Sequence, residues 1–329
     1  MNAQQFKRRQ TALHRLVDAR LSALVRRSVC PPLIEGCRHV LQTGGKRARA
    51  LLVLLSAEAV GGRARDALDA AAATEILHNF TLVHDDIMDH AATRRGKPTV
   101  HVRWNVNYAL LVGDALVGLA YRGLLETRSP NIRRMVRLFT DGLLEVCEGQ
   151  ALDLSHEKLR RPTMHAYFAM IEKKTARLFS MAAELGALAG GGRPAQVRAL
   201  RTFGRYLGRA FQVQDDLLDV IANQQEFGKT IGGDIRERKK TFLWLAALDH
   251  TTGSDHQALL RIMDPRMRIT PHTISRVARI YRTSGGIDRA RAQIHRDTNR
   301  AIAALRPLGT AEASMRLHWF SEQLLHRVS

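Results

Sequence analysis

The chain has 329 residues and a formal net charge of +20, and 45% of its residues are hydrophobic but only 5% aromatic. Leu and Ala dominate and strand-like alternation is scarce, so this composition favours an all-α fold. The basic residues are scattered without aromatic interleaving, and we therefore expect no nucleic-acid function. Peripheral association with an anionic membrane stays open. The longest apolar stretches, 50–60 and 108–121, are short or interrupted by Glu58 and Asp114 and predict no membrane span.

Cys30, Cys37 and Cys147 have neither the spacing of a metal site nor that of a disulfide framework. Reduced thiols are typical of cytosolic proteins. Residues 1–10 are polar and basic and lack the apolar segment of a secretory signal. We therefore expect a cytoplasmic protein.

The first predicted element is an amphipathic helix over residues 4–28. Further along, a Gly pair precedes Lys46 and Arg49 at the start of a helix predicted over 50–60. Cations are unusual at a helix start, because the helix dipole favours anions there. The segment is therefore either a solvated basic turn or an anion pocket formed by Lys46, Arg49 and backbone N–H groups.

A second long helix is predicted over residues 65–89, and it ends in Asp85, Asp86 and Asp89. Helical residues four apart lie about 40° apart around the axis, so Asp85 and Asp89 project from one face. Such a cluster is often a solvated helix end. The same spacing recurs at residues 215–219, however, and two matching carboxylate clusters predict a shared divalent-metal site. His78, two turns before Asp85, has the position of a packed core residue.

A basic loop at residues 90–98 follows the first Asp cluster. The loop at 227–234 is rich in Gly but lacks the spacing of a nucleotide-binding P-loop. No charge run or linker marks a boundary, so we expect one domain over residues 1–329, a bundle of roughly ten or more helices around a deep apolar pocket. The remaining helices are predicted over 106–127, 131–157, 163–190 and 195–223, with several shorter ones after residue 241.

Carboxylate oxygens are ligands that Mg²⁺ prefers, and Mg²⁺ often shares its coordination sphere with substrate phosphates. Lys and Arg side chains from several segments would neutralise the rest of a diphosphate and make it a competent leaving group. An apolar helical lining would keep the resulting cation away from water. No nucleophilic triad, zinc site or dinucleotide fold is visible in the sequence. The pattern therefore points to ionisation of a carbon–oxygen bond to diphosphate.

Six motifs follow one another along the chain: Gly44 to Arg49, Asp85 to Asp89, Arg94 to Thr99, Lys174-Thr175, Gln212 to Asp219, and Gly228-Lys229 through Lys239. In these motifs and their order, the chain resembles the trans-prenyl diphosphate synthases of the polyprenyl synthetase family. The resemblance implies the all-α isoprenoid synthase fold, a homodimer, and an Mg²⁺-dependent head-to-tail condensation of isopentenyl diphosphate with an allylic diphosphate. The allylic substrate would ionise first, the double bond of isopentenyl diphosphate would attack the cation, and a proton would then be lost.

The resemblance also implies a role for each motif. Asp85, Asp89 and Asp215 would bind about three Mg²⁺ ions, supported directly or through water by Asp86, Asp216 and Asp219. The diphosphate of isopentenyl diphosphate would be held without metal by Lys46, Arg49, His78 and Arg95. The allylic diphosphate would be held by Arg94, Lys174, Lys229 and Lys239. The reacting centre would be lined by Gln150, Asp153, Thr175 and Gln212.

Product length in this family depends on the bulk beneath the first Asp cluster, where the growing tail descends. Phe80 lies about one and a half turns before Asp85, so its ring would form the floor of the pocket, with Thr81 beside it. The cluster has no two-residue insertion, and the pattern resembles enzymes that make the C20 product, geranylgeranyl diphosphate. If Phe80 only packs against a neighbouring helix, a C15 product or one of C25 and longer follows.

Two other classes of protein are alternatives. A class I terpene cyclase also ionises an allylic diphosphate, but it usually carries a different second motif and needs no second diphosphate pocket. A regulatory subunit of a heteromeric synthase tends to lose one Asp cluster, whereas both are complete in this sequence. We therefore expect a prenyltransferase.

Overall fold

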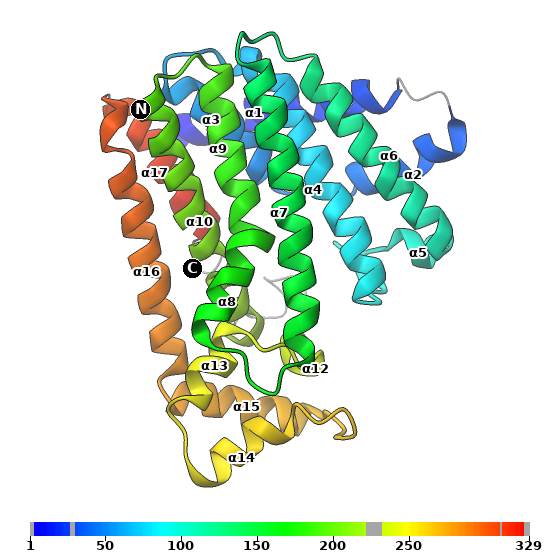
Figure 1. Cartoon of the computed structure of the whole chain (residues 1–329), viewed down its shortest axis with the longest axis vertical. Coiled ribbons are helices and arrows are strands. Elements are labelled where there is room, and N and C mark those ends of the chain that lie inside the picture. Colours follow the sequence, from blue (N-terminus) through cyan, green and yellow to red (C-terminus); the bar gives the residue numbers. More distant parts are fainter. Residues whose placement is uncertain (1–2, 27–29, 222–231, 310, 326–329) are drawn as a thin grey trace. The chain divides into compact units, whose positions relative to one another are not determined.

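The structure is a computed structural model that describes residues 3–26, 30–221, 232–309 and 311–325. The described chain is helical almost throughout, which confirms the predicted all-α class (Figure 1). Among the described residues, the only strands are β1 (Thr93–Arg94) and β2 (Lys97–Pro98). The longer helices are α1 (Ala3–Arg26), α2 (Pro31–Leu41), α3 (Ala48–Ala59), α4 (Leu68–Met88), α6 (Val106–Leu125), α7 (Ile132–Lys158), α8 (Met164–Ile171), α9 (Arg177–Ala189), α10 (Pro194–Ile221), α14 (Gly253–Arg261), α15 (Pro271–Thr283), α16 (Gly286–Ala304) and α17 (Ala311–Leu325).

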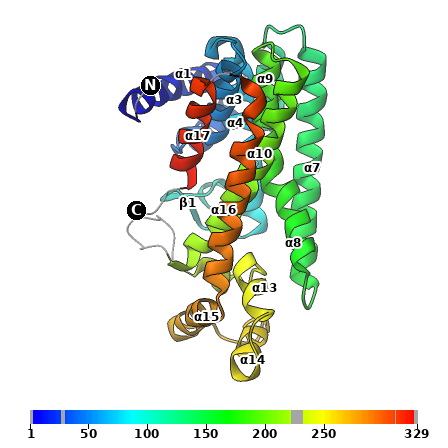
Figure 2. The same ribbon diagram turned by 90° about the vertical axis from the view of Figure 1, so that its left-hand side faces the viewer.

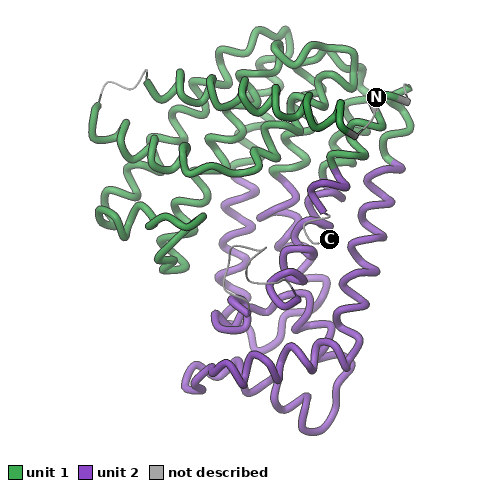
Figure 3. Tube along the Cα trace, turned by 180° about the vertical axis from the view of Figure 1, so that it is seen from behind, with its two compact units in different colours: residues 1–143, 178–204, 304–320 green, residues 144–177, 205–303, 321–329 purple. Residues whose placement is uncertain are grey.

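Short elements connect these helices. They are the 3₁₀ turns η1 (Ala64–Ala67) and η3 (Arg306–Leu308), the π-helical turn η2 (Glu172–Ala176), and the helices α5 (Val100–Arg103), α12 (Gly233–Arg236) and α13 (Phe242–Leu248). The chain forms two compact units, which Figure 3 shows in different colours. Unit 1 comprises residues 1–143, 178–204 and 304–320, and unit 2 comprises 144–177, 205–303 and 321–329. Each unit draws on three separate stretches of the chain, so neither is a contiguous sequence domain. The single domain expected from the sequence stays a prediction.

In unit 1, α4 is the helix around which its neighbours pack, with α1, α2, α3 and α6 all in contact with it. The first turns of α4 are a run of four alanines, Ala70 to Ala73, and none of the four is exposed. Alanine favours the helix and lets neighbouring helices approach closely. The apolar face continues with Ile76 and Leu77, which are also fully buried. This packing fixes the C-terminal end of α4, where the first Asp cluster lies.

In unit 2, the core surrounds the short helix α13, every residue of which is buried. Trp244 is fully buried and its indole N–H donates to the carbonyl of Leu259 at 3.0 Å, so the ring adds apolar burial without an unsatisfied donor. Figures 1 and 2 both show α14 and α15 beside α13, at the end of α16 where that helix begins. Val213 and Leu217 on α10 belong to the same core, and their packing holds the helix that carries the second Asp cluster.

The helix predicted over residues 163–190 is present over residues 164–189, but it is not α-helical throughout. The segment consists of α8, the π-helical turn η2 and α9. A π-helical turn accommodates one extra residue in a helix and turns the side chains that follow it, and such turns are frequent at functional sites. Side-chain periodicity could not show it, because the segment is apolar on several faces. The turn contains Lys174 and Thr175.

One of the described helices, α6, is long and apolar enough to cross a membrane by length and composition alone. The core helix of a water-soluble protein meets the same criterion. In α6, 44% of the apolar window is buried inside the protein.

Candidate active site

The first Asp cluster lies at the C-terminal end of α4. The helix ends at Met88, and the N–H of Asp89 donates to the carbonyl of Asp85 at 2.8 Å as the helix cap. A helix C-terminus carries a partial negative charge, which makes it an unfavourable place for carboxylates. The position therefore favours a bound cation, and this is the first observation of the structure that fits the predicted metal.

Asp86 has a protein partner, the guanidinium of Arg94 on β1, at 2.7 Å. The Asp86 carboxylate is buried, and burial raises its pKa above the ordinary value while the charge of Arg94 opposes this rise. The ion pair connects the end of α4 to the strand that follows it. Asp86 thus orients Arg94, one of the residues expected to hold the allylic diphosphate.

Between β1 and β2 the chain makes a tight hairpin whose two central residues, Arg95 (φ 53°) and Gly96 (φ 74°), both have left-handed backbones. Such dihedrals are typical of the type I′ turn of a two-residue hairpin, which suits Gly but strains Arg. The Arg95 guanidinium donates to the carbonyl of Gly44, in the Gly-rich segment before α3. The hairpin thus brings Arg95 to the segment that carries Lys46 and Arg49.

Arg49 and His78 lie against each other, as expected for residues that share one anion. The Nη1 of Arg49 lies 3.0 Å from the Nε2 of His78. Since a guanidinium only donates, Nε2 accepts, and the proton of the neutral ring is on Nδ1. That Nδ1 is buried and has no partner among the described residues. A buried N–H donor without a partner is costly, so the position fits an anionic acceptor such as a phosphate oxygen.

The charge state of His78 follows from its surroundings. Burial lowers the pKa of His78 well below its ordinary value, and the nearby arginines, with Arg49 first, lower it further. The imidazole is therefore neutral at pH 7. The ring is therefore suited to donate a hydrogen bond to an anion, and Arg49 and Arg95 carry the positive charge nearby.

Arg47 belongs to the same motif, but its side chain is buried and is bound by other groups of the protein. It is 5% exposed, has a left-handed backbone (φ 45°) and is the N-cap residue of α3. Its guanidinium donates to Glu75 at 3.3 Å, to Asp18 at 3.1 Å and to the carbonyl of Leu41. No role was predicted for Glu75 from the sequence. A carboxylate inside the Ala-rich, buried run 70–77 of α4 is the signal that could have revealed this buried ion pair.

The second Asp cluster lies in the last turns of α10, again at a helix C-terminus. Asp216 accepts hydrogen bonds from the hydroxyl of Tyr167 (2.6 Å), the amide of Gln212 (3.0 Å) and the N–H of Phe242 (3.0 Å). Burial raises the pKa of Asp216 to about 6, against the opposing effect of these three donors. Asp219 accepts from the N–H groups of residues 233 and 234, both at 3.1 Å, and so caps the first turn of α12.

The π-helical turn presents two of the expected residues to neighbouring helices of unit 2. Lys174 forms an ion pair with Asp153 on α7 at 2.5 Å. The hydroxyl of Thr175 donates to the Oε1 of Gln212 at 2.7 Å, and Gln212 in turn donates to Asp216. The structure therefore brings Lys174 to Asp153 as an ion pair, and it joins Thr175, Gln212 and Asp216 in a chain of hydrogen bonds. Connected networks of this kind fix side-chain positions.

Gly149 on α7 explains how close α7 comes to this turn. A Cβ added at Gly149 would lie 2.3 Å from the backbone nitrogen of Lys174. No side chain fits at such a distance, so glycine is required for the contact between α7 and η2. Gln150 is the next residue of α7 and is half-buried. Gln150 was expected at the reacting centre, whereas the packing role of Gly149 was not predicted from the sequence.

The remaining expected residues have the following positions. Lys239 pairs with Glu237 at 2.7 Å, just after α12. Lys229 lies outside the described residues. Phe80 is half-buried on α4, with its ring 4.8 Å from that of His84, and Thr81 donates to the carbonyl of His78 at 2.8 Å. Tyr167, the partner of Asp216, was not predicted, because its role depends on a contact across the fold.

The side chains of the described residues do not form a complete metal site by themselves. Within the described ranges, no three His, Cys, Asp or Glu side chains form a group that could hold a metal ion by themselves. Mg²⁺ keeps several waters and binds through one or two carboxylates together with substrate phosphates, so a complete protein cage is not required. Each of the two Asp clusters, at the negative end of its own helix, fits this mode of binding.

The chain is similar to known proteins over most of its length. Residues 31–281 match the family model described as polyprenyl synthetase. A geranylgeranyl diphosphate synthase of Methanosarcina mazei is 40% identical over 235 residues, which are 71% of this chain and 72% of the relative. The crystal structure of geranylgeranyl pyrophosphate synthetase from Pyrococcus horikoshii is 35% identical, superposes with a TM-score of 0.93 and covers 100% of both chains.

A third solved structure bears on the ligands. The geranylgeranyl pyrophosphate synthase of Corynebacterium glutamicum, in complex with isoprenyl diphosphate and magnesium, is 26% identical with a TM-score of 0.88. It covers 96% of this chain and 99% of the solved one. That protein thus binds the two kinds of ligand for which the present side chains are suited.

Proposed function

Because this chain belongs to the polyprenyl synthetase family and is a trans-prenyltransferase, we propose that it condenses isopentenyl diphosphate with an allylic diphosphate to give geranylgeranyl diphosphate (C20). The observation that carries the proposal is the group of Arg49, His78 and Arg95, with a buried N–H that has no partner among the described residues. A condensation needs a second diphosphate pocket, and a terpene cyclase does not. The chain therefore has a feature that only the condensation uses.

We propose that Asp85, Asp89 and Asp215 bind Mg²⁺. Bound Mg²⁺ supplies charge that stabilises the departing diphosphate. Asp86 and Asp216 would act as positioning groups, because Arg94 holds one and three hydrogen-bond donors hold the other.

Asp219, with its two backbone N–H partners, would act in the same way as a positioning group. The number of about three ions per active site follows the family and is part of the proposal.

The two diphosphates would be bound by separate cationic groups. Isopentenyl diphosphate would bind to the group formed by Lys46, Arg49, His78 and Arg95. The allylic diphosphate would bind with the metal and with Arg94, Lys174, Lys229 and Lys239. Gln150, Asp153, Thr175 and Gln212 would orient the reacting atoms, since the last three belong to networks whose geometry is fixed by hydrogen bonds and an ion pair.

The reaction would then proceed in three steps. The bond from carbon to the diphosphate oxygen of the allylic substrate breaks, and the departing diphosphate takes the electron pair. The double bond of isopentenyl diphosphate attacks the allylic cation and forms the new carbon–carbon bond. The resulting cation loses a proton, for which the departed diphosphate is the acceptor. Buried apolar surface excludes water, which would otherwise quench either cation.

A homodimer is part of the proposal. Four apolar side chains of α5 and α6 are 42 to 57% exposed, which leaves an apolar face in unit 1 that a second copy would cover: Val102, Val106, Leu110 and Leu111. We also propose that the protein is cytoplasmic. Peripheral contact with an anionic membrane is part of the proposal too, because the net charge of +20 would favour it.

The test is an assay of the purified protein with Mg²⁺, isopentenyl diphosphate and each of dimethylallyl, geranyl and farnesyl diphosphate. Mass spectrometry of the products should show the C20 diphosphate, and chelation of Mg²⁺ should abolish its formation. A C15 product, or one of C25 and longer, would change the assigned chain length but not the assigned reaction. Release of diphosphate from an allylic substrate without isopentenyl diphosphate would indicate a cyclase, and absence of turnover with every starter would refute the proposed reaction.

A further inference from the structure

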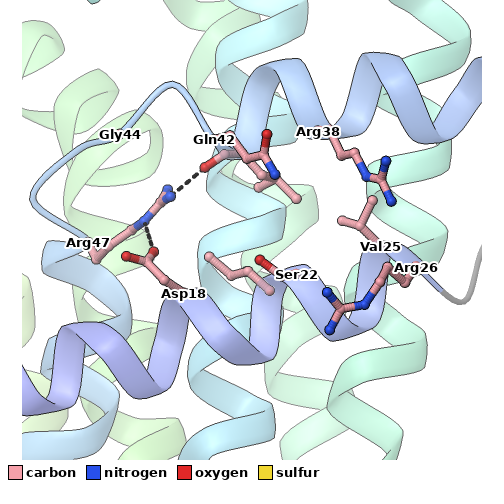
Figure 4. Close-up of a pocket in the computed structure, with 10 residues that line it drawn as sticks. Asp18, Ser22, Val25, Arg26, Arg38, Gln42, Gly44 and Arg47 are labelled. Carbon is pink, nitrogen blue, oxygen red and sulfur yellow. Dashed lines mark hydrogen bonds and ion pairs between the residues drawn. The ribbon is translucent and has the colours of Figure 1, made fainter.

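A cavity of about 470 Å³ lies in unit 1, between α1, α2 and the segment that leads to α3 (Figure 4). Its size falls in the range of small-molecule sites, about 300 to 1,000 Å³. Its walls include Arg26 and Leu21 of α1, Arg38 and Leu41 of α2, and Arg47. None of Lys46, Arg49, His78 and Arg95 lines it, although Gly44, which accepts a hydrogen bond from Arg95, does. The cavity therefore adjoins the cationic group assigned to isopentenyl diphosphate but shares none of its side chains.

Two arginines give the cavity an unbalanced positive charge. Arg26 is in the last turn of α1 and Arg38 in the last turn of α2, and both are exposed. Neither side chain has a hydrogen bond or ion pair with any of the described residues, and Figure 4 shows the two side chains at the same end of the cavity. The one carboxylate in the lining, Asp18, is already engaged by the guanidinium of Arg47 at 3.1 Å. The formal charges of the side chains that line the cavity therefore favour the binding of an anion.

The lining also has an apolar part and further hydrogen-bonding groups. Leu21, Val25 and Leu41 are nearly buried and form an apolar wall. Ser22 and Gln42 add a hydroxyl and an amide. Arginine presents several N–H donors in a planar arrangement that matches phosphate oxygens in pairs. A ligand with a phosphate or diphosphate group at one end fits both parts of this lining.

We propose that this cavity is a second anion site, which binds a diphosphate group between Arg26 and Arg38. The diphosphate is either the free inorganic ion or one esterified to a short isoprenoid, whose chain would lie against Leu21 and Val25. The site lies beside the buried Arg47, whose guanidinium also contacts Glu75 of α4. The inference concerns a site outside the proposed reaction and does not require that reaction to occur.

Equilibrium dialysis of the full chain without Mg²⁺ tests the proposal, with radiolabelled inorganic diphosphate, isopentenyl diphosphate and geranylgeranyl diphosphate as separate probes. The double variant Arg26→Gln/Arg38→Gln should bind at least one of these probes with one site fewer per chain, or bind at that site at least about tenfold more weakly. Loss of a single charge-assisted hydrogen bond is enough for such a change. Both substitutions are at exposed residues, so the variant is expected to fold.

The matched control is Arg8→Gln/Arg15→Gln, which removes the same charge from exposed positions of α1 that do not line the cavity. It should keep every site of the wild type. If the cavity variant and this control bind all three probes with equal stoichiometry and affinity, the proposal is overturned. Loss of inorganic diphosphate alone identifies the free ion, and preferential loss of a prenyl diphosphate identifies the ester. Absence of prenyl transfer in the wild type would refute the proposed function but would leave the dialysis result unchanged.

Discussion

At the scale of single residues, Arg47 and Arg49 are two positions apart and have different surroundings. Arg47 is held by Glu75 and Asp18, whereas Arg49 contacts His78 and lies 4.6 Å over the ring of Phe179. A motif in which several basic residues stand together could suggest that all of them bind the substrate. The structure divides them, because a buried ion pair occupies Arg47 and fixes the loop that carries its neighbours.

Replacing Glu75 with Gln should lower the free energy of unfolding by about 3 kcal/mol, because it leaves the charge of Arg47 buried with only Asp18 beside it. Urea unfolding at one fixed protein concentration measures the change. The control is Asp66→Asn, which breaks the exposed pair with Arg63 and should have a much smaller effect, because water and salt screen an exposed pair. If both substitutions lower the free energy of unfolding by the same amount, the buried pair stabilises the fold no more than the exposed pair does.

His78 should make stability depend on pH. Its pKa is lowered in the folded chain, so the unfolded chain binds more protons at acidic pH. The contribution of a neutral His78 to the free energy of unfolding is therefore fully present above the ordinary pKa of 6.5, and it is lost as the pH falls below that value. We expect the melting temperature of the wild type to fall more steeply between pH 7 and pH 5 than that of His78→Gln. Parallel curves for the two proteins would contradict the assignment.

Phe80 is the residue on which the product length is expected to depend. Phe80→Ala removes a ring from α4 below the first Asp cluster, and products longer than C20 should appear in the mass spectrum. Leu82→Ala is the control, because Leu82 is half-buried on the same helix and has no assigned place in the pocket. If Phe80→Ala leaves the product distribution unchanged, the ring only packs against His84.

At the scale of elements, the π-helical turn η2 depends on the close approach of α7. Gly149→Ala should cost about 1 to 3 kcal/mol of stability, since its Cβ would meet the backbone of Lys174. It should also lower kcat, because it displaces Lys174 and Thr175 from Asp153 and Gln212. Gly118→Ala is the matched control on α6, where an added Cβ meets no atom within 4 Å. That substitution should stabilise the helix slightly and leave turnover unchanged. A fully active Gly149→Ala enzyme would contradict this account.

The boundaries of several helices could be predicted closely from the sequence. The predicted ranges 106–127 and 195–223 end within two residues of α6 and α10, because apolar periodicity and flanking Gly and Pro residues are strong local signals. Both Asp clusters and the Gly-rich segment were found from their spacing. The ion pair of Arg47 with Glu75, the hydrogen bond of Tyr167 to Asp216 and the approach of Gly149 to Lys174 were not. Each of these joins residues far apart in sequence, and no local pattern records such a contact.

At the scale of the whole molecule, the exposed apolar face of α5 and α6 bears on assembly. A double substitution of Leu110 and Leu111 by Lys should place two charges in the interface of the proposed dimer and shift the protein to a monomer. Light scattering coupled to size-exclusion chromatography measures the mass. Leu159→Lys, at another exposed leucine, is the control and should leave the mass unchanged. A wild-type protein that is monomeric at micromolar concentration would refute the dimer.

The discontinuous composition of the two units has a consequence for how the protein is made in the cell. Unit 1 includes residues 304–320, and unit 2 includes residues 205–303 and 321–329, so each needs segments that are synthesised late. Domains of a nascent chain usually fold one after another as they leave the ribosome. Neither unit of this chain can do so, because the early helices wait for partners that have not been translated. Folding is thus expected after release, with apolar helices such as α4 and α6 dependent on chaperones in the meantime.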